Sequence, residues 1–213
     1  DGVDHGPRVQ SFWQWQLDED AIDVAALVQW KQGIVSKLTS GVAGLLKNHK
    51  IDLHLGAATV VAKDKVEVAG KDGKQTLQAK NIVVATGSTP IEIPGFPFDG
   101  DNVWSSTHAL SPKQLPKRML VIGGGYIGLE LGLVYHNLGT EITVVEFMDR
   151  VLPGMETELS KEMGRSLKKK KIAVHLGAKA KSYKADKDGL HVDVEIDGKV
   201  QTFACDVVLS TVG

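Results

Sequence analysis

A glycine-rich turn between two short apolar runs constrains the fold of this chain most strongly. The apolar residues 119–122 lead into the run 123–128, Gly-Gly-Gly-Tyr-Ile-Gly, which has the form G-x-G-x-x-G. Apolar residues then recur at spacings of three and four up to Gly139, as on one face of a helix. A second apolar run, residues 142–145, ends at Glu146. The order strand, glycine turn, helix, strand and acid predicts the opening of a dinucleotide-binding unit.

Each glycine of this turn has a physical role in such a unit. Gly123 permits the tight turn that follows the strand, and Gly125 lets the backbone approach a pyrophosphate. Gly128 allows the helix to lie close to the sheet. The first N–H groups of that helix lack partners within the helix and carry a partial positive charge, which favours a phosphate. The turn therefore predicts a pyrophosphate site.

Glu146 predicts which dinucleotide is bound. Its carboxylate can accept hydrogen bonds from both ribose hydroxyls and would repel a 2′-phosphate. The residues that follow, Phe147, Met148 and Asp149, include no arginine to neutralise such a phosphate. We therefore expect NAD rather than NADP. A glycine turn without a ligand is the alternative, and the surrounding strand–helix–strand pattern disfavours it.

Composition excludes several classes of protein. The 213 residues are 42% hydrophobic and 24% charged with a net charge of −1, as in ordinary globular domains. No basic excess indicates nucleic-acid binding, no apolar run approaches the roughly 20 residues that span a bilayer, and no signal peptide opens the chain. Cys205 is the only cysteine, which rules out an internal disulfide and a cysteine-pair metal site. A cytoplasmic location is the expectation.

An internal repeat predicts two related domains. Residues 51–57, Ile-Asp-Leu-His-Leu-Gly-Ala, resemble residues 172–178, Ile-Ala-Val-His-Leu-Gly-Ala. We expect residues 51–55 to form a short strand. Each copy follows a predicted helix, at 24–50 or 156–170, and precedes short strands separated by Asp-Gly turns. Each then ends in an apolar run that we expect to be a buried strand, residues 82–85 or 207–210.

The repeat predicts an α/β fold with two tandem Rossmann-like domains, each a parallel sheet with a three-stranded meander. The second domain, at 112–213, contains every expected element. The first, at 1–111 with its connector, begins at its second helix and lacks the opening strand, glycine turn and following strand. We therefore expect the first domain to be incomplete and the chain to be an internal fragment of a longer protein.

Together these motifs resemble the flavoprotein disulfide reductases, and among them the dihydrolipoamide dehydrogenases. The resemblance covers essentially the whole chain and depends on the glycine turn with Glu146, on the helical segment 30–47, and on residues 85–95, Ala-Thr-Gly-Ser-Thr-Pro-Ile-Glu-Ile-Pro-Gly. The glycine motifs are shared with glutathione and mercuric reductases. The helical segment and Glu146 favour the NAD-using group.

The resemblance implies FAD and NAD as cofactors and assigns residues to each. For FAD they are Ala58, Thr86, Gly87 and Ser88. For NAD they are Gly123, Gly124, Gly125, Tyr126, Ile127, Gly128, Leu129, Glu130, Glu146, Ala180 and Gly213. Tyr126 matches a residue that gates the nicotinamide face of the flavin, and Glu130 matches the partner of a lysine near the flavin. We expect Glu130 to be half buried because Leu129 and Leu131 flank it.

The same resemblance implies parts that this chain does not have. The family passes electrons from a dithiol to a cysteine pair, then to FAD and then to NAD, and it uses a His-Glu pair as acid–base catalyst. The chain has no Cys-x4-Cys motif, and none of its seven histidines has the required context. We therefore assign no catalytic or metal-binding residue here and expect the isolated polypeptide to be inactive. Cys205 is interpreted as a packed, unreactive thiol.

For the intact protein, the resemblance implies oxidation of dihydrolipoamide with NAD+. Its implied partners are the lipoyl domains and the E2 component of 2-oxoacid dehydrogenase complexes, together with a second copy of itself. Another disulfide reductase, of the mercuric or glutathione type, is one alternative. A stand-alone NAD-binding module is the other.

Overall fold

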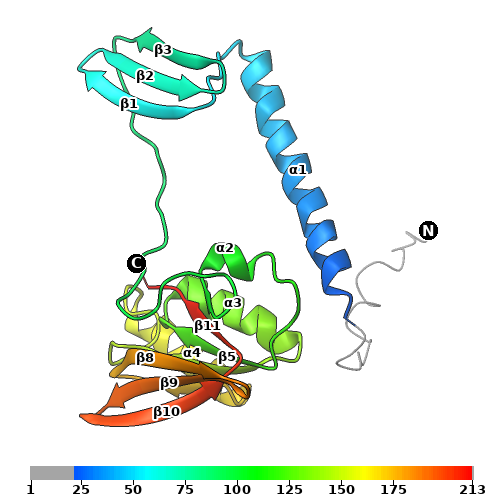
Figure 1. Cartoon of the computed structure of the whole chain (residues 1–213), viewed down its shortest axis with the longest axis vertical. Coiled ribbons are helices and arrows are strands. Elements are labelled where there is room, and N and C mark those ends of the chain that lie inside the picture. Colours follow the sequence, from blue (N-terminus) through cyan, green and yellow to red (C-terminus); the bar gives the residue numbers. More distant parts are fainter. Residues whose placement is uncertain (1–21, 213) are drawn as a thin grey trace, which may run out of the picture. The chain divides into compact units, whose positions relative to one another are not determined.

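The computed structural model describes residues 22–212, and contacts divide them into two compact units (Figure 1). One unit contains Gln29–Thr89, and the other contains the remaining described residues. Each unit is described separately. Within residues 22–212, no helix is both long enough and apolar enough to cross a lipid bilayer.

A parallel sheet of five strands forms the centre of the larger unit. Its strands run in the order β4-β11-β5-β6-β7, and every neighbouring pair is parallel. The bounds are β4 (Val103–Trp104), β11 (Val207–Ser210), β5 (Arg118–Ile122), β6 (Glu141–Val145) and β7 (Ala173–His175). The nearly continuous apolar sequences of β5, β6 and β11 explain their central position, because a parallel sheet is covered on both faces.

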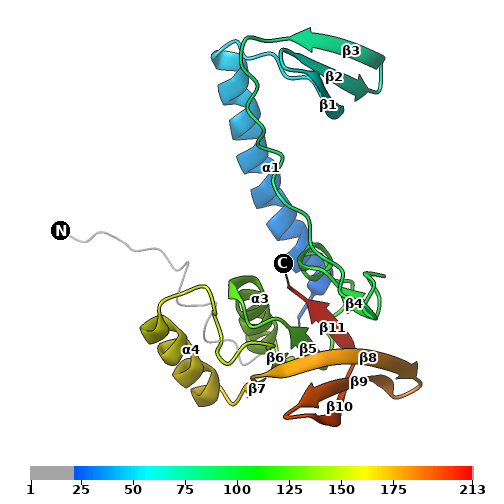
Figure 2. The same cartoon turned by 90° about the vertical axis from the view of Figure 1, so that its left-hand side faces the viewer.

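Helices cover one face of this sheet and a β-meander covers the other (Figure 2). The helices α3 (Tyr126–Asn137) and α4 (Thr157–Lys169) contribute Leu129, Tyr135 and Leu167 to the core on their side. The short helix α2 (Ser106–Ala109) adds Ala109 to the same core. Sequence periodicity predicted α3 and α4, whereas β4 and α2 lie in the connector at the end of the first predicted domain, where no such elements were expected.

The meander has the three antiparallel strands that the Asp-Gly turns predicted. They are β8 (Ala178–Asp186), β9 (Gly189–Ile196) and β10 (Lys199–Cys205). Leu190, Val192 and Val194 on the middle strand are buried against the parallel sheet, while the residues between them are partly exposed. This alternation is typical of a sheet with one solvated face.

The smaller unit contains little buried surface. It comprises most of α1 (Val24–Asn48) and an antiparallel sheet of β1 (Ala57–Ala62), β2 (Lys65–Gly70) and β3 (Gly73–Gln78). Asp23 caps α1, since its Oδ1 accepts the N–H of Ala26 at 2.9 Å. No residue of α1 is buried, and Val68 is the one fully buried side chain among the described residues of this unit.

Two strand predictions in this unit are wrong. Residues 51–55 and 82–85 form no strand, and Val83 and Val84 are 87% and 72% exposed. The continuous apolar sequence of residues 82–85 suits a strand buried on both faces, and the alternating sequence of residues 51–55 suits a strand with one buried face. However, no neighbouring strand pairs with either segment within residues 22–212. Without a neighbouring strand, neither the hydrogen-bond ladder nor the burial can form.

Candidate functional site

The glycine turn between β5 and α3 is built by close contacts with the sheet. Gly123 has φ +104°, a conformation that favours glycine, and its N–H donates to the carbonyl oxygen of Val145 at 2.9 Å. A Cβ placed on Gly128 would collide with the carbonyl oxygen of Gly123 and lie 2.5 Å from Oγ1 of Thr211. These two glycines therefore have the roles in the turn and in helix packing that the sequence predicted.

Thr211, which directly follows β11, holds the turn in place. Its Oγ1 donates to the carbonyl oxygens of Ile122, at 3.1 Å, and Gly123, at 3.2 Å. Its N–H also donates to the carbonyl oxygen of Ile122, at 2.9 Å. The end of β11 and the end of β5 are thus fastened together under the glycine turn.

Gly125 faces open space at the start of α3. A Cβ placed on it would meet no atom within 4 Å, in contrast to Gly128. Gly125 is also the N-cap of α3, and no side chain caps this end of the helix. The first N–H groups of α3 are therefore available to an anion, and the backbone can approach that anion without a side chain intervening.

Glu146 lies at the end of β6 beside this turn. It is only 6% exposed, and its Oε2 accepts the N–H of Gly124 at 2.6 Å while its Oε1 accepts the N–H of Met148 at 2.7 Å. A carboxylate has about four acceptor positions, so two of them remain for other donors. The backbone thus holds a fixed negative charge next to the glycine turn.

The loop after β6 closes against the other side of the turn. The N–H of Leu152 donates to the carbonyl oxygen of Gly124 at 2.8 Å, and a Cβ on Gly124 would lie 3.3 Å from Cγ1 of Val151. Ser160 on α4 anchors this loop, because its Oγ donates to the carbonyl oxygen of Val151 at 2.6 Å. Sequence reasoning missed Thr211, Val151 and Leu152. The position of Thr211 after a buried strand was the only available signal for any of them.

The structure places most of the predicted NAD residues around this turn. Tyr126, Ile127 and Leu129 lie in the first turn of α3, where Tyr126 is 60% exposed and Leu129 is buried. Glu130 is exposed, so the expectation of a half-buried carboxylate is wrong: α3 turns this position to solvent. Ala180 lies on β8, opposite Val194, and Gly213 is outside the described residues.

The predicted FAD residues all lie in the smaller unit. Ala58 is exposed on β1, opposite Val68 of β2. Thr86, Gly87 and Ser88 are exposed and belong to no strand or helix, and Gly87 has φ +73°. Within residues 22–212, the only G-x-G-x-x-G turn is the one at 123–128, which belongs to the larger unit.

Cys205 is buried at 2% exposure at the end of β10. Burial raises the pKa of its thiol to about 12, so it is protonated and unreactive at neutral pH. Among the described residues, no group of three histidine, cysteine or acidic side chains is placed to bind a metal ion.

Comparisons with known proteins agree on one family for this chain. The model of the family described as "Pyridine nucleotide-disulphide oxidoreductase" matches residues 6–213. A dihydrolipoyl dehydrogenase of Bacillus subtilis is 45% identical over 193 residues, which are 90% of this chain and 41% of that protein. A mitochondrial dihydrolipoyl dehydrogenase of Dictyostelium discoideum is 42% identical over 90% of this chain and 40% of its own length. The chain thus spans about two fifths of these relatives.

Solved structures share the fold. LpdA from Mycobacterium tuberculosis matches 95% of this chain and 44% of its own with a TM-score of 0.82 at 20% identity. The HOCl-induced flavoprotein disulfide reductase RclA from Escherichia coli matches 87% of this chain and 42% of its own with a TM-score of 0.73 at 24% identity. With the family model covering nearly the whole sequence, the chain belongs to the pyridine nucleotide-disulphide oxidoreductase family.

Proposed function

We propose that this chain supplies the NAD(H)-binding part of a dihydrolipoyl dehydrogenase. One observation carries the proposal: Glu146 is fixed by the N–H groups of Gly124 and Met148 beside an uncapped helix start at Gly125. This arrangement offers a hydrogen-bonding acid for a ribose and backbone donors for a pyrophosphate. The identity to dihydrolipoyl dehydrogenases over 90% of the chain supports the same assignment.

In this proposal the protein residues bind and orient the dinucleotide. The first N–H groups of α3 hold the pyrophosphate, and the open space over Gly125 lets it approach the backbone. Glu146 accepts hydrogen bonds from the adenosine ribose and repels a 2′-phosphate. Tyr126, exposed at the start of α3, covers the nicotinamide side in this proposal. The resemblance to the family assigns Ala180 and Gly213 to the remainder of the site. Bound NAD+ supplies the hydride acceptor.

For the whole protein, we propose oxidation of dihydrolipoamide with NAD+ through FAD and a redox disulfide. Ala58 and Thr86–Gly87–Ser88 would contribute to the flavin site, and segments beyond this chain would provide its glycine turn, the cysteine pair and the catalytic histidine. The proposed partners are lipoyl domains of 2-oxoacid dehydrogenase complexes and a second copy of the protein. The proposed location is cytoplasmic, where a lone thiol such as Cys205 is ordinary.

Titration of the chain with NADH and NADPH, followed by fluorescence, tests the nucleotide assignment. We expect NADH to bind more tightly. In Glu146→Gln the amide oxygen can still accept the N–H of Gly124, but the NH2 group cannot accept the N–H of Met148 and the charge is lost. Losing hydrogen bonds to a charged group costs about 1.5–3 kcal/mol, so NADH affinity should fall by roughly ten- to a hundredfold.

The matched control is Glu141→Gln, which removes the same charge at the exposed opposite end of β6. This variant should bind NADH as the parent chain does. Equal affinity of the parent chain for NADH and NADPH would exclude the role of Glu146. Tighter binding of NADPH would favour an NADPH-using disulfide reductase of the glutathione or mercuric type.

A further inference from the structure

A cavity of about 560 Å³ lies between α4, β7 and the loop before α4, and no residue of the glycine turn lines it. We call it the basic groove. Its lining residues are Arg150, Val151, Ser160, Lys161, Gly164, Lys168, Lys171, Ile172, Val174 and Leu176. A volume of this size is typical of small-molecule sites.

The groove exists because α4 turns its smallest side chains towards it. Ser160 and Gly164 are one helical turn apart and lie on one face. A Cβ placed on Gly164 would meet no atom within 4 Å. Alternate residues of the chain through β7, Ile172, Val174 and Leu176, form an apolar floor, and Leu176 remains 40% exposed.

The rim of the groove is positively charged. Arg150, Lys161, Lys168 and Lys171 line it, and no aspartate or glutamate does. Arg150 is held in place by hydrogen bonds from Nη1 to Oγ1 of Thr157, at 3.0 Å, and from Nη2 to the carbonyl oxygen of Pro153, at 3.1 Å. Within residues 22–212, no ion pair involves any of the three lysines.

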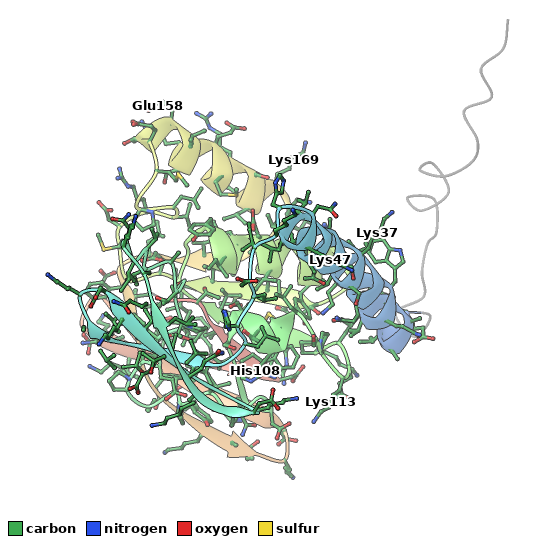
Figure 3. All side chains as sticks on the ribbon, turned by 90° about the horizontal axis from the view of Figure 1, so that it is seen from above. Lys37, Lys47, His108, Lys113, Glu158 and Lys169 are labelled. Atoms are coloured by element: carbon green, nitrogen blue, oxygen red, sulfur yellow. The ribbon has the colours of Figure 1, made fainter. Side chains whose placement is uncertain are left out.

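The helix dipole does not explain all of the positive charges around the groove. Lysines in the last turn of a helix are favoured by the helix dipole, and Lys169 illustrates this at the opposite end of α4 from Glu158 (Figure 3). However, Lys161 lies in the second turn of α4, where the dipole gives no such preference, and Arg150 lies outside the helix. Charges from three different places in the chain thus surround one apolar floor.

We propose that the basic groove binds a medium-chain aliphatic carboxylate, with its tail on the apolar floor and its head group at the lysines. Charge complementarity selects an anion, and the floor selects an alkyl tail rather than a compact inorganic ion. The occupant touches Val151 but not the glycine turn, so this site is separate from the proposed dinucleotide site. The proposal does not depend on the identity of the dinucleotide.

Calorimetric titration of the full chain with decanoate, below its micelle-forming concentration, tests the proposal. We expect saturable binding of one molecule, no detectable binding of acetate, and clearly weaker binding of decanol. Octanoate has two fewer methylene groups and should bind roughly tenfold more weakly, because each buried methylene contributes a factor of about three to four. Equal binding of decanol and decanoate would overturn the proposal.

Two matched variants locate the site within the same lysine-rich helix. Lys161→Gln with Lys168→Gln removes two lining charges and should weaken decanoate binding about fivefold, as expected for partly exposed ion pairs. Lys169→Gln with Lys170→Gln removes two charges that do not line the groove and should leave binding unchanged. Equal weakening in the two double variants would overturn the proposal.

A third variant fills the groove directly. Gly164→Leu places a side chain in the open space beside α4 and removes a glycine from the helix, so the fold should be retained. Decanoate affinity should fall at least tenfold. Full affinity in a variant whose circular dichroism matches the parent would overturn the proposal. If this variant fails to fold, the chain-length series and the two lysine variants still decide the question.

Discussion

Gly125 and Gly128 are three residues apart, and their surroundings are opposite. A side chain on Gly128 would meet the carbonyl of Gly123, the hydroxyl of Thr211 and Cγ1 of Val121, at 3.0 Å, all in the packed interior. A side chain on Gly125 would meet nothing. The same residue type therefore serves packing at one position and, by our proposal, ligand approach at the other.

These surroundings predict different effects of two alanine substitutions. Gly128→Ala should lower the free energy of unfolding by about 1–3 kcal/mol, because overpacking forces the backbone apart. Gly125→Ala should leave the urea midpoint of unfolding nearly unchanged and should weaken NADH binding. Urea unfolding and NADH titration of both variants provide the measurement. Unchanged NADH affinity in Gly125→Ala would contradict the pyrophosphate site.

Sequence reasoning predicted the structural roles of Gly123 and Gly128 because glycine patterns report backbone requirements directly. It could not predict Thr211 or Val151, because their roles come from the pairing of β11 with β5 and from loop closure, which bring distant segments together. It placed Glu130 incorrectly, because apolar neighbours at i−1 and i+1 on a helix point to other faces.

At the scale of the elements, one ion pair fastens the parallel sheet to the meander. Asp206 stands between β10 and β11, and its Oδ1 accepts Nη2 of Arg118 at 2.7 Å while its Oδ2 accepts the Arg118 N–H at 2.8 Å. Nη2 of Arg118 also donates to the carbonyl oxygen of Asp188, in the turn between β8 and β9, at 3.1 Å. Three segments of the chain thus meet at the first residue of β5.

This cluster predicts a pH dependence of stability. Burial alone would raise the pKa of Asp206, but the hydrogen bonds and charge of Arg118 lower it overall. The stabilisation is therefore complete above the unfolded pKa of about 3.9 and is lost as pH falls through the lower folded pKa. Between pH 6 and pH 3, the free energy of unfolding measured with urea should fall less for Asp206→Asn than for the parent chain.

Asp101→Asn is the control for this measurement. Its pair with Lys113 spans 3.7 Å, and both side chains are largely exposed. It should show the same pH dependence as the parent chain, because such pairs contribute little. An identical pH dependence in Asp206→Asn and the parent would show that Asp206 does not contribute.

Periodicity predicted the long elements α1, α3, α4, β6 and β9 because each carries a sustained pattern. It failed for residues 51–55, which alternate between apolar and polar, and for the apolar run 82–85, because either pattern shows only a capacity for burial. Whether a strand forms depends on a neighbouring strand, and that information lies outside the run itself. The short β4 was missed for the converse reason, since its two residues form a strand only because β11 pairs with them.

For the whole molecule, burial is distributed unevenly between the two units. The parallel sheet has one hydrophobic core on its helix side and one on its meander side. Every buried residue of these two cores lies at Phe96 or later in the sequence. In the smaller unit α1 has no buried residue, and an isolated helix is marginally stable in water. The two units should therefore differ in local stability.

Hydrogen–deuterium exchange followed by mass spectrometry measures this difference. Amides of β5, β6 and β11 should exchange slowly, at rates limited by global unfolding, whereas amides of α1 should exchange within seconds to minutes. Equal protection of α1 and β5 would show that the chain alone stabilises both units to the same extent.

Because Val83 and Val84 are exposed, the polypeptide should self-associate as its concentration rises. Three residues of the run Ile82-Val83-Val84-Ala85 are β-branched, and the run is uncharged and has no strand partner within residues 22–212. These features lead chains to pair with one another edge to edge. Light scattering should rise steeply with protein concentration, and Val83→Lys should suppress that rise. The polypeptide would then need dilution, or a complementary strand added in trans, to stay monomeric.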